Sequence, residues 1–164
     1  MTLVRQLLPK DSEEFRSLRL EALQRHPEAF GSSHAEEVDR PVSSFADWIT
    51  GGYIVGGFVD GQLDATAGLL TSAKAKSRHK GMIWGVYVRE NRRGSGLADA
   101  VMTTVLAHAE EQVEQVHLSV AATNKRAIGF YERLGFKPFG TEPRALKVDG
   151  IYIDELLMVK ILRC

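Results

Sequence analysis

The first half of the chain shows two different spacings of apolar residues. A helical spacing of three and four residues is marked by Phe15, Leu18, Ala22 and Leu23. Apolar runs over residues 53–59 and 62–70 flank the Asp60-Gly61 pair, and this arrangement is a strong signal for a β-hairpin. Ser44 to Asp47 resembles a capping box and predicts that a short helix begins there. A first strand is predicted at residues 3–8.

The second half alternates strands with helices. Residues 82–88 form an apolar run broken by Gly85, which predicts a central strand with a bulge at the glycine. Apolar residues then repeat at helical spacing over residues 97–109 and 127–134. Further strands are predicted at residues 116–120, 136–139 and 151–162. This order of elements predicts an α/β (α+β) fold in one domain, residues 1–164, with helices on both faces of a mixed sheet.

Composition and charge then narrow the classes of partner. The 164 residues are 44% hydrophobic and carry 21 basic and 21 acidic side chains, so the formal net charge is zero. A protein that binds bulk nucleic acid or an anionic membrane needs an excess of basic residues, so neither partner is expected. No apolar run reaches the roughly 18 residues of a membrane span and no signal peptide is recognisable, so a cytoplasmic location is expected.

The cysteine and histidine content argues against a metal or a disulfide. The one cysteine, Cys164, is the last residue, which excludes a disulfide within the chain and a cysteine-based metal site. His79, His108 and His117 have no paired ligand spacing, so no metal is expected. If the chain forms a homodimer, we expect sheet edges or helix faces to hold it together.

One stretch combines a strand end, a tight turn and a helix start. Residues 86–88 end a buried strand, and Arg93, Gly94 and Gly96 lie just before a helix predicted to begin near Ser95. Glycines let the backbone expose consecutive N–H groups, and the start of a helix favours an anion. A pyrophosphate fits such a site, with Arg93 adding a cation. From these residues alone, an ordinary glycine turn entering a helix is the alternative.

These residues also resemble a known family. The segment Arg93–Ala98 matches the Arg/Gln-x-x-Gly-x-Gly/Ala signature of the GNAT N-acetyltransferase superfamily. A second stretch resembles that family's second motif, at the expected distance, through Leu118, Val120, Asn124, Ala127, Phe130, Tyr131, Leu134, Gly135 and Phe136. Glu90 departs from the proline that relatives often have in this turn. The resemblance covers nearly the whole chain and implies a mostly antiparallel sheet.

The resemblance implies an acetyl-CoA-dependent transferase that moves an acetyl group to a primary amine of a small molecule or peptide. Direct attack by the amine is expected rather than an acetyl-enzyme, because Cys164 is terminal and carries no motif. It places the Val86 N–H against the thioester oxygen and Tyr131, as the catalytic residue, near the sulfur. Lys125 or Arg126 would reach the 3′-phosphate. The residues implied to bind acetyl-CoA are Val86, Tyr87, Val88, Arg93, Gly94, Ser95, Gly96, Leu97, Ala98, Asn124 and Tyr131.

Several alternatives stay open at this point. Asn124 is also a suitable helix cap, and Tyr131 also lies on an apolar helix face where a core role is common. The general base is not evident, and the candidates are Glu28, Glu142, Asp154 and Glu155. Two other classes of function compete with an enzyme. One is a non-catalytic acyl-CoA-binding sensor module, and the other is an interaction protein that does not bind CoA at all.

Overall fold

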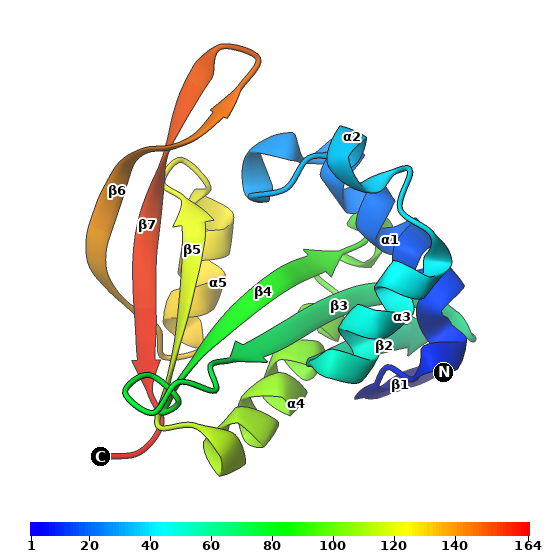
Figure 1. The fold of residues 1–164 in the computed structure, drawn as a ribbon, viewed down its shortest axis with the longest axis horizontal. Helices are drawn as coiled ribbons and strands as arrows, with labels where there is room; N and C mark the ends of the chain where they lie inside the picture. The colour runs from blue at the N-terminus through cyan, green and yellow to red at the C-terminus, as the bar shows by residue number, and fades with distance from the viewer.

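A seven-stranded sheet organises the structure, a computed structural model that describes residues 1–164. Its strand order is β1-β2-β3-β4-β5-β7-β6 (Figure 1). The strands are β1 (Thr2–Gln6), β2 (Tyr53–Val59), β3 (Gln62–Thr71), β4 (Lys80–Val88), β5 (Gln115–Ala121), β6 (Lys137–Val148) and β7 (Ile151–Ile161). All neighbouring strands are antiparallel except β4 and β5, which are parallel. The expected mixed, mostly antiparallel sheet is confirmed.

Helices lie on both faces of this sheet, as predicted. In Figure 1, α1 and α3 lie in front of the first strands, while α4 crosses behind them and α5 lies beside β5. The helices are α1 (Ser12–Arg25), α2 (His34–Glu37), α3 (Val42–Gly51), α4 (Leu97–Gln112) and α5 (Lys125–Arg133), with 3₁₀ turns η1 (Pro9–Asp11), η2 (Pro27–Ala29) and η3 (Glu90–Arg92). None of these helices has the length and apolar character needed to cross a membrane.

Burial on both faces explains why apolar residues occupy neighbouring positions in β2. Ile54 and Val55 are neighbours in β2, but successive side chains of a strand point to opposite faces. Ile54 therefore packs with Phe15 and Phe45 under α1 and α3, whereas Val55 belongs to the cluster that contains Val101 of α4. Each fully buried side chain of this size contributes about 1.5–3 kcal/mol, so both layers stabilise the sheet.

The start of α3 differs from the prediction. The helix begins at Val42, after Pro41 as N-cap residue, so the predicted capping box at residues 44–47 is wrong. Proline has a fixed φ and no N–H, and it suits a position at a helix start, where it sets the first turn two residues earlier. A capping box is present instead in α2, where the Ser33 hydroxyl accepts a hydrogen bond from the Glu36 N–H.

Two other boundaries also move. β6 spans 12 residues rather than the predicted four, because antiparallel pairing with β7 extends it through a polar segment. Helix α4 begins at Leu97, with Gly96 as its N-cap, rather than near Ser95. The predicted hairpin is confirmed, since Asp60 and Gly61 connect β2 and β3 and both have positive φ, 50° and 85°.

Candidate active site

The cleft of the molecule opens where β4 and β5 separate. These two strands pair only at Lys80–Met82 and Gln115–His117, and beyond that point they diverge (Figure 1). The cleft between them has a volume of about 700 Å³. It is lined by His26, Glu28, Ala29, Phe30, Val86, Tyr87, Val88, Arg92, Arg93, Gly94, Gly96, Ala98, Asp99, Ala121, Thr123, Asn124, Arg126, Ala127, Phe130, Tyr131 and Arg133.

The outer part of β4 forms one wall of the cleft. The predicted bulge is present, since Gly85 has a φ of +63° and β4 has one extra residue between the pairs that Tyr87 and Trp84 make with β3. Val86 and Val88 pack against the cluster under α4, whereas Tyr87 packs under α1. No residue of β4 after Met82 pairs with β5. This edge of the strand is therefore free to pair with an extended ligand.

The turn before α4, for which an anion site was predicted, forms one end of the cleft. Gly94 and Gly96 have φ values of +79° and +87°, a left-handed conformation that glycine adopts without a steric penalty. Arg93, both glycines and Ala98 line the cleft. The side chains of Ser95 and Leu97 do not line it, because Leu97 is buried under the sheet and the Ser95 hydroxyl donates to the Arg92 carbonyl. Those two residues can contribute only backbone groups.

A buried carboxylate holds the approach to this turn. The Asp64 side chain, only 1% exposed, accepts hydrogen bonds of 2.8 Å from Arg89 Nη1 and from Arg92 Nε. Glu21 Oε2 accepts from the Tyr87 hydroxyl at 2.9 Å and from Arg89 Nε at 3.2 Å. Burial, together with the bond to Glu21, raises the pKa of Tyr87 to about 12. Tyr87 is therefore a structural donor rather than a base.

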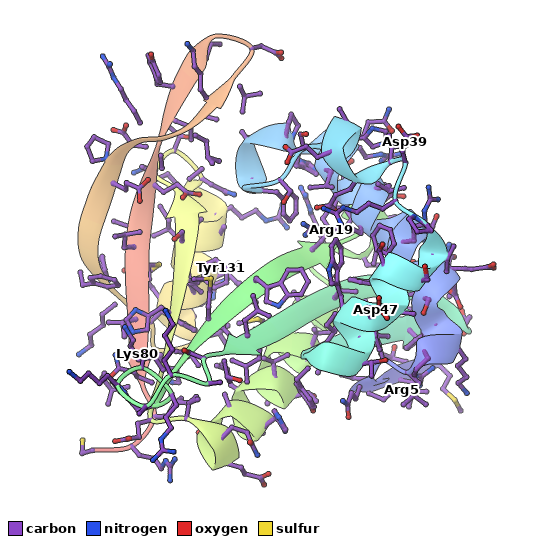
Figure 2. All side chains as sticks on the ribbon, in the orientation of Figure 1. Arg5, Arg19, Asp39, Asp47, Lys80 and Tyr131 are labelled. Atoms are coloured by element: carbon purple, nitrogen blue, oxygen red, sulfur yellow. The ribbon has the colours of Figure 1, made fainter.

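Helix α5 forms the opposite wall. Asn124 caps it as predicted, with Oδ1 accepting from the Ala127 N–H at 3.2 Å. Tyr131 is buried, and burial raises the pKa of its hydroxyl, which therefore stays protonated. That hydroxyl makes no hydrogen bond within the protein. Trp84 Nε1 is the only fully buried side-chain nitrogen or oxygen atom without a partner, so the Tyr131 hydroxyl keeps some accessible surface. Because Tyr131 lines the cleft, its hydroxyl is accessible from there. Figure 2 shows Tyr131 between β4 and β5.

The charges around the cleft favour an anionic ligand on the side of the turn and α5. Four arginines line the cleft, namely Arg92, Arg93, Arg126 and Arg133, against the two carboxylates Glu28 and Asp99. Arg126 lines the cleft and Lys125 does not, which separates the two residues considered for a phosphate contact. No group of three or more His, Cys, Asp or Glu side chains is arranged to hold a metal ion.

The candidate general bases fall in different places. Glu28 lines the cleft. Glu142 and Glu155 face each other across β6 and β7, and burial together with the charge of Glu142 raises the pKa of Glu155. Asp154 Oδ1 accepts from the Arg144 N–H at 2.8 Å, so this carboxylate has a structural partner. Of the four, Glu28 alone lines the cleft.

Two polar residues of this region, His26 and Arg19, were not predicted from the sequence. His26 lines the cleft, with Nε2 3.3 Å from a Glu90 carboxylate oxygen and Nδ1 3.8 Å from one of Glu28. Arg19 lies beside β4 and pairs with Glu37. Both arginine and histidine lie in or just after a helix whose apolar face was the only visible pattern, so no local signal marks either of them.

Comparisons with known proteins identify the family of the chain. The acetyltransferase (GNAT) family model matches residues 14–136. Two L-methionine sulfoximine/L-methionine sulfone acetyltransferases, from Pseudomonas paraeruginosa and Pseudomonas aeruginosa, are 34% identical to the chain over 76 residues. This match spans 44% of the chain and 43% of each relative, which is less than half of their length.

Solved structures share the fold at low sequence identity. A GNAT-family acetyltransferase from Streptococcus pneumoniae superposes with a TM-score of 0.88 at 19% identity, over 98% of this chain and 99% of that one. The yncA protein of Salmonella typhimurium, solved with its cofactor acetyl-CoA, gives 0.86 at 17% identity, over 100% and 95% of the chains. A ribosomal-protein-alanine N-acetyltransferase from Brucella melitensis gives 0.85 at 21%, over 98% and 99%.

Proposed function

Because the chain belongs to the GNAT acetyltransferase family, we propose that it is an acetyl-CoA-dependent N-acetyltransferase that acetylates a primary amine by direct attack. One observation carries the proposal. The unpaired edge of β4, the left-handed glycines of the turn and the open Tyr131 hydroxyl all face the same cleft. When bound, acetyl-CoA supplies an acetyl group activated as a thioester.

The side of the cleft formed by residues 93–98 and α5 is here called the cofactor end. Backbone N–H groups of the turn and the start of α4 donate to the pyrophosphate, and Arg93 balances its charge. The free edge of β4 pairs with the extended pantetheine arm, which Asn124 also contacts. Arg126 binds the 3′-phosphate. The excess of arginine over carboxylate along the cleft supports this orientation.

The chemistry needs a donor for the oxygen and a donor for the sulfur of the thioester. The Val86 N–H serves the oxygen, and donors of this kind contribute about 3–4 kcal/mol in proteases. The Tyr131 hydroxyl donates a hydrogen bond to the departing sulfur. Burial raises the pKa of Tyr131, so the proton stays on the oxygen and the hydroxyl acts as a hydrogen-bond donor throughout the neutral range.

The opposite side of the cleft, with Glu28, Phe30 and the outer part of β4, is called the acceptor end. Glu28 is the candidate that removes a proton from the amine, because it lines the cleft. An α-amine is about one-tenth neutral at pH 7, whereas a lysine-like amine is neutral in about one molecule in several thousand. The partial likeness to L-methionine sulfoximine acetyltransferases supports an α-amine of a small amino acid as the acceptor.

Native mass spectrometry with acetyl-CoA, followed by a thiol-release screen of amines, tests the proposal. We expect one acetyl-CoA per chain and release of free CoA with at least one class of amine. Because Cys164 is an exposed thiol, a Cys164→Ser variant removes its background from the thiol assay. Binding without release for every amine would favour the alternative, a non-catalytic acyl-CoA-binding sensor, and absence of binding would contradict both functions.

A further inference from the structure

Arg19 of α1 is a nearly buried cation that is only partly used by the protein. Its side chain is 9% exposed, and its Nε and Nη2 each donate to one oxygen of Glu37 at 3.0 Å. Glu37 is itself buried, with a side chain that is 5% exposed. This paired contact docks α2 on α1 and fixes the plane of the guanidinium.

The third nitrogen of Arg19, Nη1, has no hydrogen-bond partner in the protein. This atom keeps some accessible surface, because it is not among the fully buried polar atoms that lack a partner. It lies 3.7 Å from the position that a Cβ on Gly85 would occupy, at the bulge of β4. The guanidinium carbon lies 5.7 Å from the ring centre of Phe30 and 5.5 Å from that of Trp84. Phe30 lines the cleft, and Figure 2 shows Arg19 between α1 and the outer part of β4.

This placement sets the chemistry of a partner. A guanidinium has five N–H donors in a planar fork, and the two contacts with Glu37 leave both N–H groups of Nη1 free. Leaving charged donors unmatched in a nearly buried setting is costly, so an acceptor oxygen is expected there. A carboxylate matches the fork and carries the opposite charge. Gly85 has no side chain that would occupy this space.

We propose that Arg19 Nη1 binds the carboxylate of the acceptor, so that the substrate is a free amino acid rather than a peptide N-terminus or an aminoglycoside. An α-amino acid carries its amine and its carboxylate on one carbon. A carboxylate held beside Gly85 therefore keeps the amine next to Val86, whose N–H serves the thioester oxygen in the proposed function. The inference rests on that function and adds that the carboxylate of the amino acid is free and that Arg19 is the residue that selects it.

Steady-state kinetics with free amino acids and their α-carboxamides test the proposal, with acetyl-CoA saturating. We expect the native chain to prefer the acid over the matched amide by about 10- to 100-fold in kcat/KM, the range of a hydrogen bond to a charged group. In Arg19→Gln and Arg19→Lys, kcat/KM for the acid should fall by a similar factor. The value for the amide should change by less than about threefold, so the preference disappears.

Arg16→Gln is the matched control. Arg16 lies one turn earlier on α1, and its Nη2 donates to the Val38 carbonyl at 2.7 Å, so it also holds the segment around α2. Its guanidinium lies over Phe45, whereas that of Arg19 lies near Phe30 and Trp84. A purely structural role for Arg19 would lower turnover of acid and amide equally, as we expect for Arg16→Gln, and would leave their ratio unchanged.

The outcomes separate this inference from the function on which it rests. Equal turnover of acids and amides by the native chain overturns the role of Arg19, a comparison that needs no variant to fold. Retention of the acid preference in both Arg19 variants also overturns it. Binding of acetyl-CoA without turnover of any amine overturns the proposed function, and this inference with it.

Discussion

The cofactor end and the acceptor end of the cleft are assembled from the chain in different ways. The cofactor end uses two short continuous stretches, the turn at residues 93–98 and the start of α5. The acceptor end combines Arg19 of α1, Phe30 after η2 and the bulge of β4, which lie far apart in sequence. In the proposed function, the first site binds its ligand mainly through backbone groups, and the second binds its ligand through side chains.

The difference shows which parts of this fold are free to change. Backbone N–H groups at a helix start recognise a phosphate whatever the neighbouring side chains are, so one motif suffices for a common cofactor. Recognition of an acceptor needs specific side chains from several elements, and these can be replaced one at a time. Substitutions at the cofactor end should therefore affect acetyl-CoA with every acceptor, and substitutions at the acceptor end should change the choice of amine.

The largest effect is expected for Gly96→Asp. The change places a carboxylate where the pyrophosphate is proposed to bind, and like charges brought together cost several kcal/mol, so the Kd for acetyl-CoA should rise about 1,000-fold. Calorimetry measures this loss. Gly61→Asp is the control, since Gly61 also has a positive φ of +85°, has no atom within 4 Å of an added Cβ and lies in the β2–β3 hairpin. If both variants bind acetyl-CoA alike, the turn does not hold the pyrophosphate.

Tyr131→Phe should have the next largest effect. The ring and its packing against Phe136 remain, but the hydroxyl that we propose donates to the sulfur is lost. We expect kcat to fall by about 100-fold while the Kd for acetyl-CoA changes little, as for the loss of a group that acts in the transition state. Full activity in this variant would leave Tyr131 as a core residue, and the cofactor site would stand without it.

Asp64→Asn tests the support beneath the cofactor end. Two arginines lose their common buried carboxylate, so the free energy of unfolding should fall by about 3 kcal/mol, and the Kd for acetyl-CoA should rise about tenfold as Arg92 loosens next to Arg93. Urea denaturation and calorimetry measure the two effects. Asp60→Asn is the control, because this exposed carboxylate pairs with the N-terminus and should change neither quantity. An unchanged Kd in a destabilised Asp64→Asn would confine Asp64 to stability.

The smallest effect is expected from Glu142→Gln in β6, outside the cleft. Glu142 faces Glu155, and burial with this charge raises the pKa of Glu155, so the ionised pair destabilises the folded state. A raised carboxyl pKa means that the penalty is present at pH 7 and is relieved as the pH falls through the folded pKa. The variant should be more stable at pH 7 by less than about 1 kcal/mol and no more stable near pH 4. A gain that persists at pH 4 would exclude this charge effect.

Local sequence patterns predicted most helices and strands. They gave wrong boundaries where a neighbouring residue sets the helix start or where pairing with another strand extends a strand. The apolar stripe from Leu97 to Ala109 and the hairpin at Asp60-Gly61 depend on residues a few positions apart, so the sequence predicted both the helix and the turn. The capping box at Ser44 failed because Pro41 sets the helix start. The predicted length of β6 was too short, because pairing with β7 holds polar residues in the strand and local spacing does not encode that pairing.

The sequence by itself determined the glycine turn at the start of α4, the cap at Asn124 and the order of strands and helices, because each depends on short-range backbone preferences and hydrogen bonds. The tertiary structure alone decided where β4 leaves β5, since that separation follows from the pairing of whole strands. It also decided that Asp64 meets Arg92 and that Arg19 reaches Gly85. Buried polar groups find their partners across long stretches of chain, and no local pattern records which partner each one meets.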